Sequence, residues 1–397
     1  MKFLIVEPQY EGHYLILYIK FLIRVLTQKK HQIIILTTKK ASKHDSFSII
    51  KKENPNIKIH YFNYSKPRIY LSFFLLLSQI KLYFTIKKSF KTIYNKYQLD
   101  HVFVNSLDHY DKAISIFGSP FKDIKFSGIY VNPKFHLKKI GIGSAGRFNL
   151  ISKFLFLKFL QIPKLNTIFT NDFFFIKYFR NSKLLNKKKI SFLFEPREFQ
   201  KKYKKNEARK ILKLPLDTTQ ILVYGALKES KGIRQLLKIL TNTKIKKTIK
   251  VILAGYQDQQ VKNFLSSDFC NNLIRKNKLI IFNGFQNDKM ESLIFSAVDL
   301  IWIGYQKNFP FLSGVLYQAA VMHKPIIASN HGIINWMNKK YNLGYSVDIE
   351  DEELLIKKIN LLCERNIYKK FSRNSKFLAK KANPRFFMRQ IYKDLTN

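Results

Sequence analysis

Two short stretches place basic or small residues where a strand-like run gives way to a helix-like one. In the first, Gly225 follows the apolar run Ile221–Tyr224, and Lys231 precedes Gly232 at the next helix start. A lysine at a helix start opposes the helix dipole, which favours a functional reason for its presence. There it can stabilise a diphosphate as a point charge. We therefore predict an anion site at this turn; a solvated surface lysine is the simpler alternative.

The second stretch is Ser313–Val315, at the start of another helix-like run. Ser313 is a good N-cap, and Gly314 permits close approach of a ligand to the backbone. The free amides of the helix start, up to Val315, attract anions. As a bare pattern, the stretch predicts only one more strand–helix unit.

A third candidate is the loop 7–14, which follows the apolar run Phe3–Val6. Gly12 lies just before a helix-period segment, so the backbone there can approach a ligand and its amides can bind phosphate. A single glycine is weak evidence, and a plain connection between strand and helix is an equally good interpretation.

These turns depend on a regular scaffold, because apolar runs of strand length alternate with helix-period stretches along the chain. The rhythm breaks around Glu195–Lys204, which begins with the turn Glu195–Phe199, and then restarts. The predicted strands are Phe3–Val6, Gln32–Thr37, Ile57–Phe62, His101–Val104, Phe126–Tyr130 and Thr167–Thr170, then Ile221–Tyr224, Lys250–Ala254, Leu279–Phe282, Leu300–Ile303, Pro325–Ser329 and Gly344–Val347. Two such sets predict an α/β protein of two doubly wound parallel-sheet domains, with ligands at the carboxyl ends of the strands.

Composition agrees with this scaffold. The chain has 397 residues, of which 46% are hydrophobic, so two sizeable cores can form and wholesale disorder is excluded. Its two cysteines, Cys270 and Cys363, lie far apart, which argues against a disulfide framework and favours a reducing compartment. There is no HExxH or CxxC pattern, so we expect no protein-bound metal. The first apolar run ends at Glu7, too soon for a signal-peptide core.

The formal net charge is +45, and the basic excess is spread over both halves. One explanation is the codon bias of an A/T-rich genome. A second is attraction to anionic lipid, at about 1 kcal/mol per basic residue near the surface. A third is nucleic acid, which would require exposed aromatic side chains along a basic stripe. The aromatic residues here fall instead within predicted strands and apolar helices, so we expect no nucleic-acid partner.

Two stretches, Ile69–Ile86 and Phe148–Gln161, are unusually apolar. Both are shorter than the about 20 apolar residues of a spanning helix. The leading interpretation is that they form helices buried against the first sheet. The second interpretation is an interfacial amphipathic helix, because basic residues such as Lys87 and Lys88 flank the aromatic and aliphatic ones.

Several segments of the second half, in order, resemble the group 1, or family 4, glycosyltransferases of GT-B fold. They are Glu207–Pro215, Tyr224–Leu227 with Lys231-Gly232, Asn283–Phe285, Ala297–Leu300, and Ser313–Ala320 with Lys324–Ser329. The first half is similar more loosely, through its first strand and Gly12-His13. The resemblance implies two Rossmann-like domains facing a central cleft: an acceptor domain at 1–198, a donor domain at 199–380, and a helix at 381–397 that returns to the first domain.

The sequence departs from the family pattern at the acidic motif. The two glutamates of the family's E-x7-E motif fall on Pro310 and Gln318, and its G-R-L arginine falls on Ala226. Gln318 can still hydrogen-bond a ribose hydroxyl as a neutral partner, whereas Pro310 cannot replace a carboxylate.

The resemblance implies hexosyl transfer from a nucleotide diphosphate sugar, with retention of anomeric configuration and no metal cofactor. Lys231 and the amides of Ser313–Val315 would stabilise the leaving diphosphate. His109 and His136 are catalytic candidates on the acceptor side, although an ordinary core or surface histidine is the favoured interpretation of each. The implied nucleotide-sugar site consists of Gly12, His13, Gly225, Lys231, Ser313, Gly314, Val315 and Gln318.

We therefore predict a glycosyltransferase of cell-surface polysaccharide or glycolipid synthesis, such as that of lipopolysaccharide. Its expected partners are a nucleotide sugar, a glycan or lipid-linked acceptor and an anionic membrane surface. We expect it to be cytoplasmic and peripheral on the inner face of the cell membrane. The alternatives are a nucleotide-sugar epimerase of the same fold, a nucleic-acid binder, and a non-catalytic GT-B subunit that binds nucleotide sugar or a partner enzyme.

Overall fold

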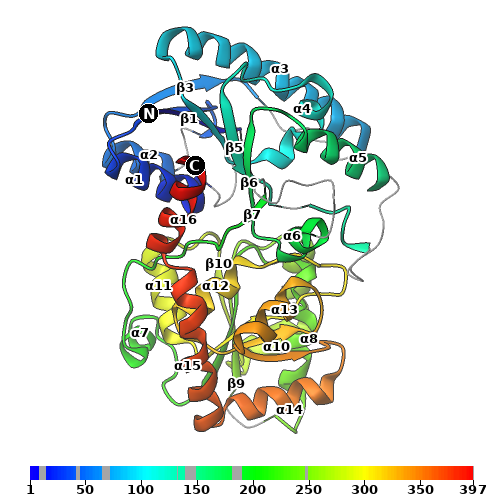
Figure 1. Cartoon of the computed structure of the whole chain (residues 1–397). Coiled ribbons are helices and arrows are strands. Elements are labelled where there is room, and N and C mark those ends of the chain that lie inside the picture. The colour runs from blue at the N-terminus through cyan, green and yellow to red at the C-terminus, as the bar shows by residue number, and fades with distance from the viewer. Residues whose placement is uncertain are drawn as a thin grey trace. The chain divides into compact units, whose positions relative to one another are not determined.

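The computed structural model describes residues 1–8, 15–41, 45–64, 72–131, 133–138, 149–180, 190–245 and 249–396. The chain folds into two compact units, each built around its own sheet (Figure 1). The N-terminal unit comprises residues 1–196 together with 384–397, and the C-terminal unit comprises residues 197–383. The chain therefore leaves the first unit within the predicted turn Glu195–Phe199 and re-enters it at Pro384.

The sheet of the N-terminal unit has seven strands in the order β3-β2-β1-β4-β5-β6-β7, and all neighbouring strands are parallel. The six predicted strands are confirmed. The seventh, β7, was missed because it is an edge strand of three residues. The strands are β1 (Lys2–Glu7), β2 (Gln32–Thr38), β3 (Lys58–Phe62), β4 (His101–Val104), β5 (Lys125–Ile129), β6 (Leu165–Thr170) and β7 (Ile190–Phe192).

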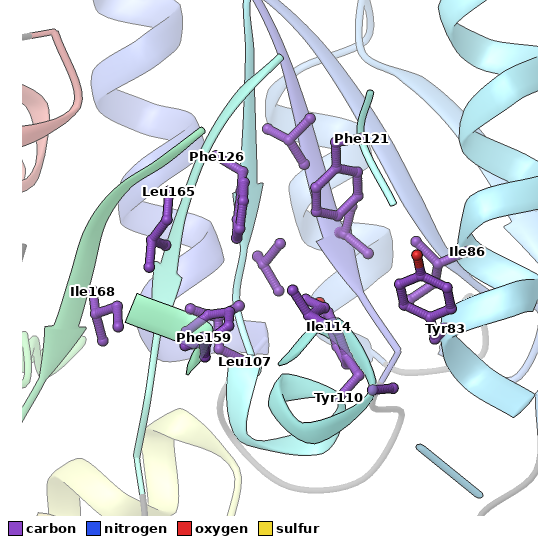
Figure 2. Close-up of a cluster of buried hydrophobic side chains, with 14 of the residues drawn as sticks. Tyr83, Ile86, Leu107, Tyr110, Ile114, Phe121, Phe126, Phe159, Leu165 and Ile168 are labelled. Atoms are coloured by element: carbon purple, nitrogen blue, oxygen red, sulfur yellow. The ribbon is translucent and has the colours of Figure 1, made fainter. Parts of the chain in front are cut away.

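Helices cover both faces of this sheet, so the central strands are apolar throughout. In β1, Leu4 and Val6 belong to one core, whereas Phe3 and Ile5 belong to the other. Figure 2 shows the first of these cores, in which aromatic side chains such as Phe126 pack between the sheet and the helices. The helical segments are η1 (Leu15–Ile19), α1 (Lys20–Gln28), α2 (Asp45–Glu53), α3 (Ser72–Tyr97), η3 (Leu107–His109), α4 (Asp111–Phe117), α5 (Asn149–Leu160), α6 (Phe173–Arg180) and α16 (Pro384–Thr396).

The last helix, α16, belongs to the N-terminal unit although it ends the chain. Its buried residues Phe387 and Ile391 join the core that also contains Phe3 and Ile5 of β1. The phenol oxygen of Tyr392 lies 3.1 Å from Nε2 of His31, which immediately precedes β2. Apolar burial on one helix face thus holds the C-terminal segment on the first unit.

The C-terminal unit has a six-stranded parallel sheet in the order β10-β9-β8-β11-β12-β13. Its strands are β8 (Thr219–Tyr224), β9 (Ile249–Gly255), β10 (Leu279–Asn283), β11 (Leu300–Ile303), β12 (Ile326–Ser329) and β13 (Gly344–Val347). All six were predicted from the sequence. Its helical segments are α7 (Lys205–Ile211), η6 (Glu229–Lys231), α8 (Ile233–Lys238), η7 (Ile239–Thr241), α9 (Gln259–Leu265), α10 (Asp268–Arg275), α11 (Asp288–Ala297), α12 (Gly314–Val321), α13 (Gly332–Tyr341), α14 (Glu352–Leu362) and α15 (Arg365–Lys381).

One local expectation changes. Asn206 was the expected cap of α7, but Lys204 occupies the N-cap position and the helix begins at Lys205, a shift of the size that frayed helix ends allow. The apolar stretch Ile69–Ile86 contributes to α3, where Leu82, Tyr83 and Ile86 are buried in the core. Over the described ranges, no helix is long and apolar enough to cross a membrane.

Candidate functional site

The order of strands in the C-terminal unit reverses between β8 and β11. From β8 the chain continues to β9 and β10 on one side, whereas β11, β12 and β13 lie on the other. Open α/β sheets bind ligands outside the carboxyl ends of the strands at such a switch point. Tyr224 ends β8 and Ile303 ends β11, so the residues that follow these two strands form the candidate site.

Lys231 reaches directly back to this point. Its Nζ donates a hydrogen bond to the main-chain oxygen of Tyr224 at 2.6 Å and lies 5.4 Å from the ring centre of Tyr305. Its own carbonyl accepts a hydrogen bond from Nε1 of Trp302 at 2.7 Å, which fixes the turn that carries it. The side chain is half-buried. An ammonium group has three donors, so this lysine can still bind an anion beyond the end of β8.

Gly225 leaves the space in front of this ammonium group open. A Cβ atom built on Gly225 would lie 3.8 Å from Nζ of Lys231, and among the described residues no other atom outside its chain neighbours comes within 4 Å. The predicted pair of Gly225 and Lys231 is thus brought together. The arrangement places a positive charge beside a length of backbone that carries no side chain.

Ser313 joins the same site through Tyr305, whose phenol oxygen lies 3.1 Å from the serine Oγ. Ser313 does occupy the N-cap position of α12, but its hydroxyl makes no capping hydrogen bond to the helix. The expected capping by its side chain was therefore wrong: the buried hydroxyl pairs with a phenol instead. Gly314 and Val315 begin α12, whose first turn has no side-chain cap and so retains amide donors.

Gln318, one turn further along α12, is buried and donates a hydrogen bond from Nε2 to Oε1 of Glu291. Glu291 lies in the first turn of α11 and is also hydrogen-bonded to the side chain of Tyr224. Burial raises the pKa of Glu291, while the charge of Arg197 and the hydrogen bonds from Tyr224 and Gln318 oppose that rise. Burial and the adjacent carboxylate raise the pKa of Tyr224, so the phenol stays protonated as the donor.

Sequence reasoning missed Glu291, Tyr224 and Tyr305 as members of this site. Tyr224 links its two halves, because its carbonyl binds Lys231 and its phenol binds Glu291. The site therefore extends continuously from Lys231 to Gln318. The only available signal was position, since Tyr224 ends one switch-point strand and Tyr305 closely follows the end of the other.

The sheet of the N-terminal unit has its own switch point, between β1 and β4. Glu7 ends β1 and is fully buried. Its carboxylate accepts a hydrogen bond from Nδ2 of Asn105. It also accepts from Oγ of Ser106, which lies 3.2 Å from each of the two carboxylate oxygens. Asn105 and Ser106 directly follow β4. Gly12 and His13 lie outside the described residues, and their assignment stays a prediction.

The two histidines predicted for the acceptor side both lie near the carboxyl ends of this sheet's strands. His109 is half-buried at the end of η3. His136 is fully buried, with Nε2 at 2.9 Å from Oδ2 of Asp172, an ion-pair distance without the alignment of a hydrogen bond. Asp172 also accepts a hydrogen bond from the amide of Phe175 at 3.0 Å. The catalytic role of either histidine stays a prediction, and His136 has no exposed surface in this conformation.

Groups of histidine, cysteine and carboxylate side chains that could hold a metal ion are absent from the described part of the chain. The two cysteines are separate thiols, Cys270 buried and Cys363 partly so. What the site at the end of β8 offers is a lysine, uncapped helix amides and polar side chains. Such groups stabilise a developing negative charge on a phosphate.

Comparison with known proteins agrees with this geometry. Residues 204–377 match the family described as glycosyl transferases group 1. No curated protein sequence matches the chain. Similar solved structures include a glycosyltransferase from Rickettsia africae ESF-5, with 18% identity, a TM-score of 0.66 and coverage of 100% of this chain and 98% of that one.

Two further structures cover both units. Sucrose-phosphate synthase from Thermosynechococcus elongatus has 13% identity and a TM-score of 0.74, over 99% of this chain and 98% of that one. Anabaena HepE in complex with UDP and glucose has 14% identity and a TM-score of 0.68, over 100% of this chain and 99% of that one. The fold is thus the predicted GT-B architecture of two Rossmann-like domains, and residues 204–377 of the C-terminal unit are similar to the group 1 glycosyltransferases.

Proposed function

We propose, from the group 1 glycosyltransferase domain that residues 204–377 form, that this protein transfers a sugar from a nucleoside diphosphate sugar to a hydroxyl acceptor. The observation that carries the proposal is the ammonium group of Lys231 at the switch point of that domain. HepE, similar in fold, has been crystallised with UDP and glucose and with UDP-glucose, which supports a donor of this class.

In the proposed mechanism, the diphosphate leaves the anomeric carbon with negative charge on its terminal phosphate. Lys231 stabilises that charge directly, and the first amides of α12 at Gly314 and Val315 contribute further donors. Gln318, oriented by its hydrogen bond to Glu291, is available for a ribose hydroxyl. These groups can stabilise the leaving group without a divalent cation, so we propose a metal-independent reaction.

The acceptor hydroxyl would bind at the carboxyl ends of the N-terminal sheet. His109 is the better-placed candidate to interact with it, because it is half-buried, whereas His136 is fully buried. We propose that His136 acts through Asp172, as a buried pair that fixes the first turn of α6. We further propose transfer of a hexose with retention of anomeric configuration, as the family resemblance implies.

A lipid-linked acceptor is proposed from the surface of the N-terminal unit. Several apolar side chains of α3, α4 and α5 are exposed, among them Leu150 at 83% and Phe154 at 56%. Lys158 lies 4.9 Å from the ring centre of Phe154, so a basic group stands beside an exposed apolar ring on α5. Exposed apolar side chains with lysines beside them can bind the headgroup region of anionic membranes. We therefore propose peripheral attachment to the inner face of the cell membrane, in the synthesis of a cell-surface glycan or glycolipid such as lipopolysaccharide.

The test is a screen of nucleoside diphosphate sugars, read as thermal stabilisation and as slow hydrolysis of the sugar–phosphate bond. We expect one donor to stabilise the wild-type protein in the presence of EDTA, and Lys231→Ala to reduce that stabilisation at the same donor concentration. NMR of the released or transferred sugar then gives the anomeric outcome. Binding without hydrolysis or transfer would favour the non-catalytic subunit, and no binding of any donor would reject the proposal.

A further inference from the structure

Helix α15 presents a strongly basic surface. Seven of its 17 residues are lysine or arginine, and none is acidic. It lies along one side of the C-terminal unit as a single continuous helix (Figure 1). Phe371, Ser375 and Leu378 form its buried side, and Phe371 belongs to the core of this unit. All seven basic residues are exposed, so they lie on the outward side of the helix.

Five of these residues form a line along the helix, which we call the basic stripe: Arg365, Lys369, Arg373, Lys376 and Lys380. They recur every three or four residues, so at about 100° per residue they fall within an arc of about 80°. At about 1.5 Å per residue, the basic stripe is about 22 Å long. It is therefore a narrow row of positive charge on a rigid element.

The basic stripe is not neutralised by carboxylates of its own unit. Elsewhere in this unit basic side chains are paired, for example Nζ of Lys238 at 3.0 Å from Glu352 and Nζ of Lys244 at 2.9 Å from Glu353. None of the five stripe side chains forms an ion pair with any described residue. Codon bias would raise the lysine content of every exposed surface, so it does not account for the exclusion of carboxylates from this helix.

Further basic groups lie beside the middle of the basic stripe. His323, in the turn between α12 and β12, has Nδ1 at 3.3 Å from Oγ of Ser375. Burial lowers the pKa of this histidine, and the charges of Lys202 and Lys376 lower it further. Lys202 is exposed, and its Nζ donates a hydrogen bond to the carbonyl of Val321 at 2.6 Å. The positive charge of α15 is thus reinforced by a second segment of the same unit.

The outward side of α15 suits a polar partner better than a lipid surface or a nucleic acid. Helices that lie on membranes insert several apolar side chains below the headgroups. Throughout α15, which is described from end to end, Phe377 at 65% is the only large apolar side chain that is exposed. Single-stranded nucleic acid would need several aromatic rings for its bases. A second helix with carboxylates at the same spacing matches the length and the width of the row, as charged residues do along paired helices.

We infer that the basic stripe docks an acidic helix of a partner protein, whose carboxylates pair with the five cations. No stripe residue belongs to the candidate donor site, so the inference does not depend on the proposed function. Single exposed ion pairs contribute little, but several in one register act together and weaken as salt rises. The match of spacing, and not the total charge of the protein, then decides which partner binds.

The probes are two synthetic alanine-based helical peptides of identical composition. In the striped peptide, five glutamates recur at the spacing of the basic stripe, whereas in the scrambled peptide they are spread around the helix. Binding to the full-length protein is followed by fluorescence anisotropy at low salt. We expect the striped peptide to bind about 10-fold more tightly than the scrambled one, because only its carboxylates can reach all five cations together.

A triple charge reversal tests whether the basic stripe is the docking surface. The stripe variant combines Lys369→Glu, Arg373→Glu and Lys380→Glu. The control variant makes the same change of charge at exposed residues of α9, α10 and α11 in the same unit: Lys262→Glu, Arg275→Glu and Lys289→Glu. The stripe variant should bind the striped peptide about 10- to 100-fold more weakly and no longer distinguish the two peptides. The control variant should keep that distinction, and a triple alanine variant of the stripe should lie between the stripe variant and the wild type.

Three results would overturn the inference. The first is equal affinity of the wild type for the striped and scrambled peptides. The second is an equal loss in the stripe and control variants, which would mean that the peptide responds only to net charge. The third is that the stripe variant, but not the control variant, loses sedimentation with anionic vesicles or binding of a single-stranded oligonucleotide, which would identify lipid or nucleic acid as the occupant.

Discussion

Asp111 should make the stability of the N-terminal unit fall as pH rises towards neutrality. This carboxyl group begins α4 and is only 3% exposed. Burial raises its pKa to about 7 from an ordinary value of 3.8. The neighbouring charge of Lys112 and a 2.9 Å hydrogen bond from the phenol of Tyr130 partly oppose the rise, and the charge of Asp108 adds to it.

The sign follows from proton binding in the two states. Well below pH 3.8, the carboxyl group is protonated in both the folded and the unfolded chain. Between about pH 4 and pH 7, the folded chain holds a proton that the unfolded chain has released, so the free energy of unfolding falls as pH rises. The difference between 7 and 3.8 is about 3 pKa units, which corresponds to a loss of about 4 kcal/mol above pH 7.

Asp111→Asn removes this titration while keeping an oxygen that accepts the hydrogen bond from Tyr130. We expect the variant to be as stable as the wild type near pH 4 and more stable at pH 8, by up to about 4 kcal/mol. Hydrogen exchange of amides in β4, α4 and β5 reports on this unit. The only two tryptophans, Trp302 and Trp336, lie in the C-terminal unit, so their fluorescence is an internal control that should not change. An advantage of the variant that is the same at pH 4 and pH 8 would refute the argument.

Three further predictions concern other parts of the chain. Lys231→Ala should weaken nucleoside diphosphate binding about 10- to 100-fold, because it removes a charged hydrogen-bond donor. Gly314→Val should also weaken binding, because its side chain keeps the ligand from approaching the backbone. If calorimetry shows unchanged affinity for both variants, the donor binds elsewhere. Burial lowers the pKa of Lys324 from 10.5 to about 8, so between these pH values the folded chain holds fewer protons than the unfolded chain. The free energy of unfolding of the wild type should therefore rise relative to that of Lys324→Met between pH 8 and pH 10.5, by up to about 3 kcal/mol. Denaturation followed by tryptophan fluorescence measures this difference, and a difference that does not change with pH would contradict the prediction. The protein should sediment with anionic vesicles at low salt, and a smaller fraction should sediment at high salt. Phe154→Ser should reduce the sedimented fraction, whereas Phe377→Ser, which also removes an exposed ring, should not. A wild-type protein that stays in the supernatant at low salt would refute membrane attachment.

The fold was predictable because its strands are buried on both faces. Such strands appear in the sequence as continuous apolar runs, and twelve of the strands in the two sheets could be located to within about two residues at most ends. The exception, β7, is a three-residue edge strand whose members are only partly buried, so it has neither the length nor the apolar run of a central strand. The boundaries of α7 were likewise less certain, because no side chain caps its start.

The candidate site was only partly predictable, because its members come from elements far apart in sequence. Lys231 and Gly225 lie on one strand–helix turn, and local patterns suffice to find them. Tyr305 and Ser313 also share one loop, but their contact depends on the path of that loop after β11. The enclosure of His136 by the α6 region depends on tertiary packing, since Asp172 lies 36 residues further along the chain.

The contact between Gln318 and Glu291 changes the meaning of the missing acidic motif. The family pattern would place glutamates at positions 310 and 318 of this chain, where proline and glutamine stand. Yet a carboxylate lies against the Gln318 amide, supplied by α11 instead of α12. The Tyr224 phenol and the charge of Arg197 stabilise its ionised form against the effect of burial. A carboxylate is therefore present at this end of the sheet on another helix, so the substitution at 318 does not by itself argue for an inactive domain.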